Sequence, residues 1–205
     1  MNKLKYIILS LFLASCSIAR AQDNNRPLFI HGLEWGGNFN YFNYRYCLFV
    51  NSDQYLEEDR TKERASHFNG FLNYNAGVAL RKMEVLAYAG YQGFYKHIRM
   101  VQTGLKTDIH RRPDRNGLFG FAEGCIGIPL FGSEDRSAVY CAGGIGYRTR
   151  LSRYVCLDHR IGISNAIVSP REITDPTTGN LVDPENIRQS RANAIGLRFS
   201  TGFRF

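Results

Sequence analysis

The sequence predicts an all-β fold, an antiparallel up-and-down transmembrane β-barrel of about eight strands. Two observations carry this prediction. Long stretches of the chain alternate between apolar and polar residues, which is the period of a β-strand whose two faces have different surroundings. The chain is also rich in glycine and aromatic residues, with 20 Gly, 12 Tyr and 14 Phe in 205 residues. A mean hydropathy of −0.29 is ordinarily typical of a soluble protein, but it does not exclude a barrel, because every second residue of barrel strands is polar.

The N-terminal residues have the order of a secretory signal peptide. Two lysines precede an apolar run over 6–14, and a small-residue Ala-x-Ala motif follows at 19–21. The apolar run is far shorter than the roughly 20 residues that a spanning helix needs. We therefore expect residues 1–21 to be removed and residues 22–205 to form one barrel domain. The tetrapeptide that ends at Cys16 also matches a lipobox, in which Cys16 would be lipidated, and both alternatives export the chain.

The C-terminal segment from 194 to 205 alternates without interruption. One face carries small residues and two arginines. The other face is mostly apolar and consists of Ile195, Leu197, Phe199, Thr201, Phe203 and Phe205. A soluble β-sandwich would explain this alternation, but it gives no reason for a terminal phenylalanine. The ending resembles the assembly signal of bacterial outer-membrane barrels, and the resemblance assigns that signal to Phe203 and Phe205.

Similar alternation predicts the other strands. Seven are clear, and we expect them at 31–49, 68–81, 84–97, 116–130, 137–148, 153–168 and 191–205. A single-chain bacterial barrel needs an even number of strands, so the weak alternation within 98–110 is expected to be the eighth. The alternation changes phase after Tyr41, which a β-bulge or an aromatic girdle would explain.

The connections sort onto two sides of the expected barrel. The short turns at 82–83 and 149–152 are expected on the periplasmic side, and the long polar segments 50–67 and 169–190 outside. The second long segment is rich in Pro, Gly, Asn and Asp, which are loop signals. Strand parity then also assigns the basic turn at 110–113 to the periplasmic side.

The hairpin over 137–168 predicts its own register. In both strands the apolar residues have odd numbers. The numbers of two residues that face each other across the hairpin should therefore have an even sum, about 300. A slip by one residue would exchange the two faces of the strand. Cys141 would then lie opposite His159, and Cys156 would point to the other face. We therefore expect no disulfide between Cys141 and Cys156.

The residues opposite the apolar faces are small or charged, and we expect them to line the lumen. The expected lumen charges are Glu34, Arg81, Glu123, Asp158, Arg160, Arg198 and Arg204. Eight strands leave an interior about wide enough for side chains to fill, and a buried charge is costly unless it is paired. The sequence thus predicts a salt-bridged plug without an open pore. A water-filled interior with weak pairing is the alternative.

No motif in the sequence carries recognisable chemistry. The histidines lack metal-site spacing and the His-x-Ser pair of barrel lipid A deacylases, and no Cys-x-x-Cys occurs. Asp108-Ile109-His110 matches a fragment of the barrel-protease motif, but a second acid pair is absent. We therefore expect no catalytic residue, no metal site and no cofactor. His159 is expected to face lipid, and the charges over 57–64 are expected to form a solvated loop.

The formal net charge of +8 falls to +5 when three cations leave with the signal peptide, and the remaining basic residues are spread along the chain, so we expect no nucleic-acid partner. The exported chain, Gly/aromatic strands such as 141–148 and terminal Phe205 resemble the eight-stranded class of small outer-membrane β-barrels. The resemblance implies an outer-membrane location, with outer-membrane lipid and the barrel assembly machinery as partners.

Architecture does not specify a function. The expected role is structural, adhesive or surface-binding through extracellular loops, with a surface ligand or an envelope protein as partner. The alternatives are a lipid-modifying outer-membrane enzyme and a narrow, porin-like channel.

Overall fold

The computed structural model describes residues 28–205 except 52, 65, 81, 97, 112–115, 130–136, 172 and 176–177. The expected signal peptide, the lipobox and Arg81 therefore lie outside the described residues. Within that part of the chain, no helix is long and apolar enough to cross a membrane. The strands are β1 (Leu28–Val50), β2 (Leu56–Glu63), β3 (His67–Leu80), β4 (Met83–Tyr95), β5 (Ile98–His110), β6 (Gly117–Pro129), β7 (Ala138–Arg150), β8 (Cys156–Val168) and β9 (Ile187–Arg204), with a short 3-10 turn, η1 (Pro184–Asn186).

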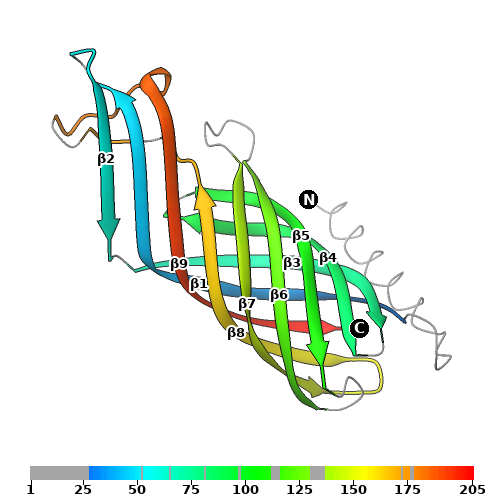
Figure 1. Ribbon diagram of the computed structural model, residues 1–205. Helices are drawn as coiled ribbons and strands as arrows, with labels where there is room; N and C mark the ends of the chain where they lie inside the picture. The colour runs from blue at the N-terminus through cyan, green and yellow to red at the C-terminus, as the bar shows by residue number, and fades with distance from the viewer. Residues whose placement is uncertain are drawn as a thin grey trace, which may run out of the picture.

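Eight strands of the described chain close into a barrel (Figure 1). Each of β3 to β8 pairs antiparallel with the next strand along the chain, and β1 pairs with both β3 and β9. Following the paired residues once around the ring, from Leu28 on β1 through β3 to β9, returns to β1 at Asn38, a shift of ten residues. Such a shear requires strongly tilted strands. We call these eight strands the ring.

Period-2 alternation explains why the ring has two different surfaces. Inward residues are buried and mostly small, polar or charged, whereas outward residues are large, apolar and exposed, including Leu72 on β3, Leu105 on β5, Ile145 on β7 and Ile163 on β8. Because the sheet is closed, every strand of the ring is paired on both sides, which is what a hydrocarbon environment demands of the backbone.

The strands expected from the sequence are confirmed, including the weakly patterned 98–110, which forms β5. The phase change in β1 is a β-bulge, because the ladder with β9 shifts register between Asn40 and Phe42. The bulge leaves the neighbouring rings of Tyr41 and Phe42 both exposed and packed edge to face, at 4.8 Å between centroids.

β2 was not expected, because the sequence analysis assigned 50–67 to a loop. Its residues, Leu-Glu-Glu-Asp-Arg-Thr-Lys-Glu, are charged on both faces and give no alternating signal. The strand forms because the second half of β1 extends past the ring and offers its backbone groups to β2 from Asn43 to Val50. β9 pairs with the other edge of the same half of β1, as far as Phe49.

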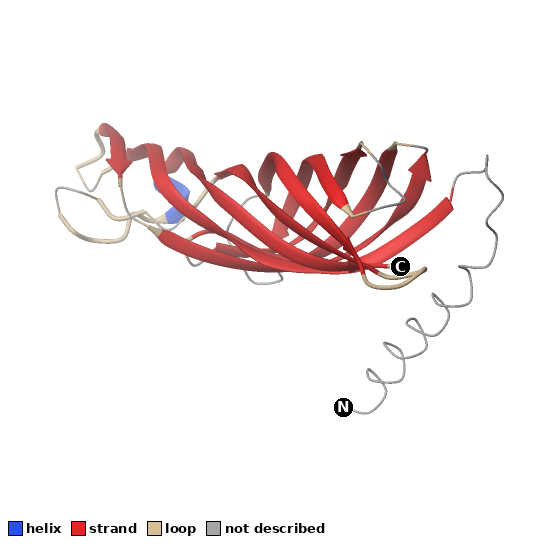
Figure 2. Ribbon diagram, turned by 90° about the horizontal axis from the view of Figure 1, so that it is seen from below, coloured by secondary structure: helices blue, strands red, loops and turns tan. Residues whose placement is uncertain are grey.

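The connections separate onto two ends of the ring. The turn end holds the short connections β3–β4, β5–β6 and β7–β8 together with the C-terminus, and the loop end holds the remaining connections. The basic turn after His110 therefore shares an end with the two other short turns, as parity required. Figure 1 shows β1, β2 and β9 continuing beyond the ring at the loop end, and Figure 2 shows η1, in blue, at the same end.

The hairpin of β7 and β8 corrects the expected register. Opposed residues have an even sum, but Cys141 lies opposite Asn165, and His159 lies opposite Tyr147. The expected turn was placed too early: β7 continues to Arg150, and the amides of Leu151 and Ser152 donate to the carbonyl of Val155 to close the turn.

Candidate functional site

The interior of the ring holds a balanced set of charges near the turn end. Among the described residues of the ring, the buried carboxylates are Glu34, Glu84, Asp108, Glu123 and Asp158, and the buried lysine and arginines are Lys106, Arg148, Arg160, Arg198 and Arg204. All ten point inward because they occupy the alternate positions of their strands. The five negative charges equal the five positive charges, as a low-dielectric interior demands.

The central group of these charges joins opposite walls of the ring. Lys106 on β5 forms an ion pair with Glu34 on β1, and its Nζ lies 3.0 Å from Oε2 of Glu123 on β6. Arg198 on β9 returns to both acids, with N–O distances of 3.3 Å to Glu34 and 2.8 Å to Glu123. Ser200 also donates to Glu34 at 2.6 Å. These bonds cross the lumen and fill its middle.

A second group lies closer to the turn end. Arg148 on β7 donates to both oxygens of Glu84 at 2.5 and 3.0 Å, and to both oxygens of Asp158 at 2.7 and 2.8 Å. Arg204 donates to Glu84 at 2.9 Å and to Asp108 at 3.0 Å. Arg160 donates to Asp108 at 2.8 Å. Bidentate guanidinium–carboxylate contacts of this kind are among the strongest hydrogen bonds in proteins.

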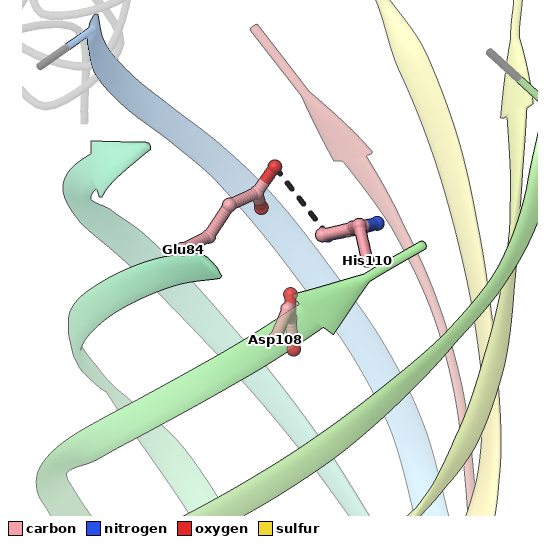
Figure 3. A group of neighbouring side chains, drawn as sticks. All are labelled: Glu84, Asp108 and His110. Carbon is pink, nitrogen blue, oxygen red and sulfur yellow. Dashed lines mark ion pairs between the residues drawn. The ribbon is translucent and has the colours of Figure 1, made fainter. Parts of the chain in front are cut away.

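Glu84, Asp108 and His110 bring candidate metal-ligand atoms within 4.8 Å of one another (Figure 3). Nε2 of His110 lies 3.5 Å from Oε1 of Glu84, and neither Nε2 of His110 nor Oδ1 of Asp108 has a hydrogen-bond partner. The other carboxylate oxygens already accept from arginines, so a divalent cation would displace guanidinium groups from a neutral cluster. The arrangement therefore fits ion pairing better than metal binding.

Towards the loop end the interior becomes apolar. Phe94, Ile98 and Met100 from the β4–β5 hairpin are buried there with Ala138 on β7 and Val168 on β8. Tyr140 bridges the polar and apolar layers: its ring packs edge to face with Phe94, while its hydroxyl donates to Asn38 and accepts from Arg198 at 2.9 Å each. The lumen of the ring is thus filled by ion pairs at one level and by packed side chains at the next.

At the loop end, the chain builds a small folded unit outside the ring, which we call the extension: residues 43–50 of β1, β2, the start of β9 and the loop over 169–186. Cys47, Phe49 and Ile173 are completely buried against one another, with Val182 and Ile187 beside them. A β-bridge between Thr174 and Leu181 folds the loop over this cluster.

The extension presents a charged surface. Arg45 on β1 pairs with Asp59 on β2 at 2.7 Å, and Arg60 pairs with Glu58. Among the described residues, no strand pairs with the outer edge of β2, and charged residues on such an edge disfavour uncontrolled strand addition. Burial in the extension raises the pKa of the Cys47 thiol to about 11, so this cysteine stays protonated near neutral pH.

The C-terminal residues complete the ring. Phe203 lies on the outer face with its ring 5.7 Å from that of Trp35, and Phe205 exchanges two backbone hydrogen bonds with His31, at 2.8 and 3.1 Å. The role of Phe203 and Phe205 as an assembly signal stays a prediction. His159 lies on the outer face, where its Nδ1 is 2.9 Å from the hydroxyl of Thr201.

The structure places six of the seven expected lumen charges in the interior: Glu34, Glu123, Asp158, Arg160, Arg198 and Arg204. Four interior charges and a histidine were not expected from the sequence, namely Glu84, Lys106, Asp108, Arg148 and His110. Arg148 is the last residue of the strand expected over 137–148, beside the short turn. The inward positions of β4 and β5 would have identified the others, but the weak alternation of β5 hid them.

A closed eight-stranded ring, an exposed apolar exterior and an ion-paired interior occur together. This is the architecture of a closed, eight-stranded antiparallel β-barrel. No family model and no curated protein matches the sequence. The crystal structure of Neisserial surface protein A is similar over 86% of this chain and 95% of that chain, at 11% identity and a TM-score of 0.43. The secretin-domain β-barrel of InvG from Salmonella is similar over 97% of this chain and 66% of that chain, at 7% identity and a TM-score of 0.25.

Proposed function

We propose that this chain is an integral outer-membrane barrel with a surface-binding role, in which a closed ring anchors the extension. The observation that carries the proposal is the extension itself. It has a buried core of its own, formed by Cys47, Phe49 and Ile173, and so presents a defined surface instead of a set of unstructured loops. The partner is a surface ligand or an envelope component.

The exterior of the ring supports the membrane location. Large apolar residues cover it on all eight strands, and a closed sheet leaves no unpaired edge in lipid. Cell fractionation tests this location: the full chain should sediment with outer membranes and migrate differently on a gel before and after heating. Recovery in the soluble periplasmic fraction would overturn it.

The filled interior of the ring favours an anchoring role for this protein and argues against a channel. Ion pairs span the lumen between β1, β5, β6 and β9, and apolar side chains fill it nearer the loop end. In planar bilayers we expect no discrete conductance steps. Regular openings at neutral pH would establish the channel alternative instead.

The tip of the extension is the surface that the binding test should alter. Tyr55 and Leu56 are 71% and 62% exposed there, while Leu151 and Tyr154 are 55% and 58% exposed in the turn at the opposite end. Bacteria that produce the full chain should attach to animal-cell monolayers or to one another more than empty cells do. The double substitution Tyr55→Ala with Leu56→Ala should remove this gain, and Leu151→Ala with Tyr154→Ala should not.

Equal attachment by all four strains would contradict the binding role. The enzymatic alternative has a separate readout, because a lipid-modifying barrel changes the mass of lipid A when it is produced. We expect unchanged lipid A mass spectra, and altered acyl chains would replace the binding role with catalysis.

A further inference from the structure

Three outward glycines lie in one row across the outer wall of the ring. Gly37 on β1 pairs with Gly70 on β3, and the β3–β4 ladder, extended by one residue beyond its last pair, brings Gly70 beside Gly93 on β4. At one end of this row Gly37 pairs with Phe199 on β9, and at the other Gly93 pairs with Arg99 on β5. Because glycines lack side chains, the row is a trench in an otherwise bulky apolar surface, exposed at Gly70 and covered at Gly37 by the ring of Phe68.

Large side chains form the walls of the trench. The next row of paired outward residues holds Trp35, Leu72 and Tyr91. Phe68 is 66% exposed and lies over Gly37, where a Cβ atom would overlap its ring. Two cavities open around Phe68, of about 500 Å³ beside Trp35 and about 280 Å³ beside Tyr91. Together they are in the range of ligand sites, which measure roughly 300–1,000 Å³.

The β5 end of the trench is polar. Arg99 is exposed on the outer face, one residue after β5 begins at the loop end, and it lines the smaller cavity. Asn69 borders the same cavity, but it belongs to the inward face of β3, and its side chain is buried. A cation thus lies at one end of an apolar groove.

We propose that this trench binds one anionic, phosphate-bearing membrane lipid. The phosphate pairs with Arg99, and one acyl chain lies over Gly70, beside the ring of Phe68, towards Trp35. The occupant is an amphiphile because the cation lies at one end only, at the level where a strand leaves the membrane. A second copy of the chain would bring another apolar exterior, which offers no anion to Arg99.

Trp35 makes the proposal measurable, because the chain has 1 Trp and this residue lines the larger cavity. The full chain is reconstituted in phosphatidylcholine bilayers. One series of bilayers contains increasing fractions of brominated phosphatidylglycerol, and the other contains the same fractions of brominated phosphatidylcholine. Bromine quenches the fluorescence of a tryptophan that it contacts. One cationic contact to an anionic lipid corresponds to a preference of about fivefold for phosphatidylglycerol.

Two substitutions and a matched control locate the site. Arg99→Gln should reduce the preference to about one. Gly70→Val should also reduce it by filling the trench, and the backbone accepts it, because the new Cβ meets nothing closer than the Gly36 carbonyl oxygen at 3.8 Å. Arg153→Gln removes the same charge from the turn end, where Arg153 is exposed, and should leave the preference intact.

Each variant is first tested for heat-modifiable migration, and Arg99→Lys, which keeps the cation, should keep most of the preference if a glutamine variant fails to fold. Equal quenching by the two brominated lipids would overturn the proposal. So would a loss in Arg153→Gln as large as that in Arg99→Gln, or an unchanged preference in Gly70→Val. Quenching that falls as the protein-to-lipid ratio rises would show a second copy in the trench, also against the proposal. Since the protein is already in bilayers, none of these results bears on binding by the extension.

Discussion

Each buried charged side chain that the structure describes inside the ring has an oppositely charged neighbour, and this pairing is what makes a charged interior tolerable. Lys106 is the clearest case, because its ammonium group lies between Glu34 and Glu123 and is completely buried. Breaking a buried pair by removing one partner leaves an uncompensated charge, which costs more than the intact pair contributes.

Lys106→Met should therefore lower the free energy of unfolding by about 3–5 kcal/mol. Adding Glu123→Gln should recover part of this loss, because it neutralises one of the two buried carboxylates that Lys106 contacts in the original chain. The measurement is urea unfolding in phospholipid vesicles. Leu105→Met is the control, since Leu105 is the adjacent outward residue and should change stability little. A loss below about 1 kcal/mol for Lys106→Met would mean that water screens the pair, as it does on protein surfaces.

At the scale of elements, β1 performs two tasks along its length. Its first half belongs to the ring, and its second half, beyond the bulge at Tyr41, forms the central strand of the extension. The bulge allows the change, since it separates two segments with different inward faces. Stability in the extension rests on Cys47, Phe49 and Ile173, which pack together away from the ring.

Phe49→Ala should open the extension without opening the ring. Truncating a buried phenylalanine costs about 3–5 kcal/mol, which is large for a unit of this size. Alkylation of Cys47, read by peptide mass spectrometry, should be slow at pH 8 in the original chain, because the thiol is buried and its pKa is raised to about 11. In the variant it should become fast while heat-modifiable migration persists. Phe42→Ala, which truncates an exposed aromatic side chain, should leave Cys47 protected.

The whole molecule depends on closure between its first and last strands. Gly36 on β1 faces Ser200 on β9, and a Cβ atom at Gly36 would overlap the Phe199 carbonyl oxygen and lie 2.7 Å from the Cα of Ser200. A side chain at this position would push the two strands apart, and an open sheet leaves unpaired backbone groups in lipid, each costing several kcal/mol.

Gly36→Val should therefore prevent closure and abolish heat-modifiable migration. Gly70→Val makes the same substitution on the neighbouring strand, where a Cβ atom has room, and it should fold. If Gly36→Val migrates as the original chain does, the seam between β1 and β9 is looser than these contacts require.

By itself, the sequence determined the ring. Alternation with period 2 over strands such as β9 requires two different environments, and parity led from seven clear strands to the eighth, β5. It also assigned Glu34 and Arg198 to the interior, because the face of a strand follows from residue number alone.

Only the tertiary structure decided which of these groups meet. Lys106 meets Glu123 because the β5–β6 ladder pairs them, and it meets Glu34 because the shear of the ring brings β1 and β5 to the same level. Shear depends on the registers of all eight strands at once. β2 likewise depends on its partner, since its charged residues favour no face until β1 extends beyond the ring. The trench has the same origin: Gly37, Gly70 and Gly93 are separate in the chain, and only the registers align them.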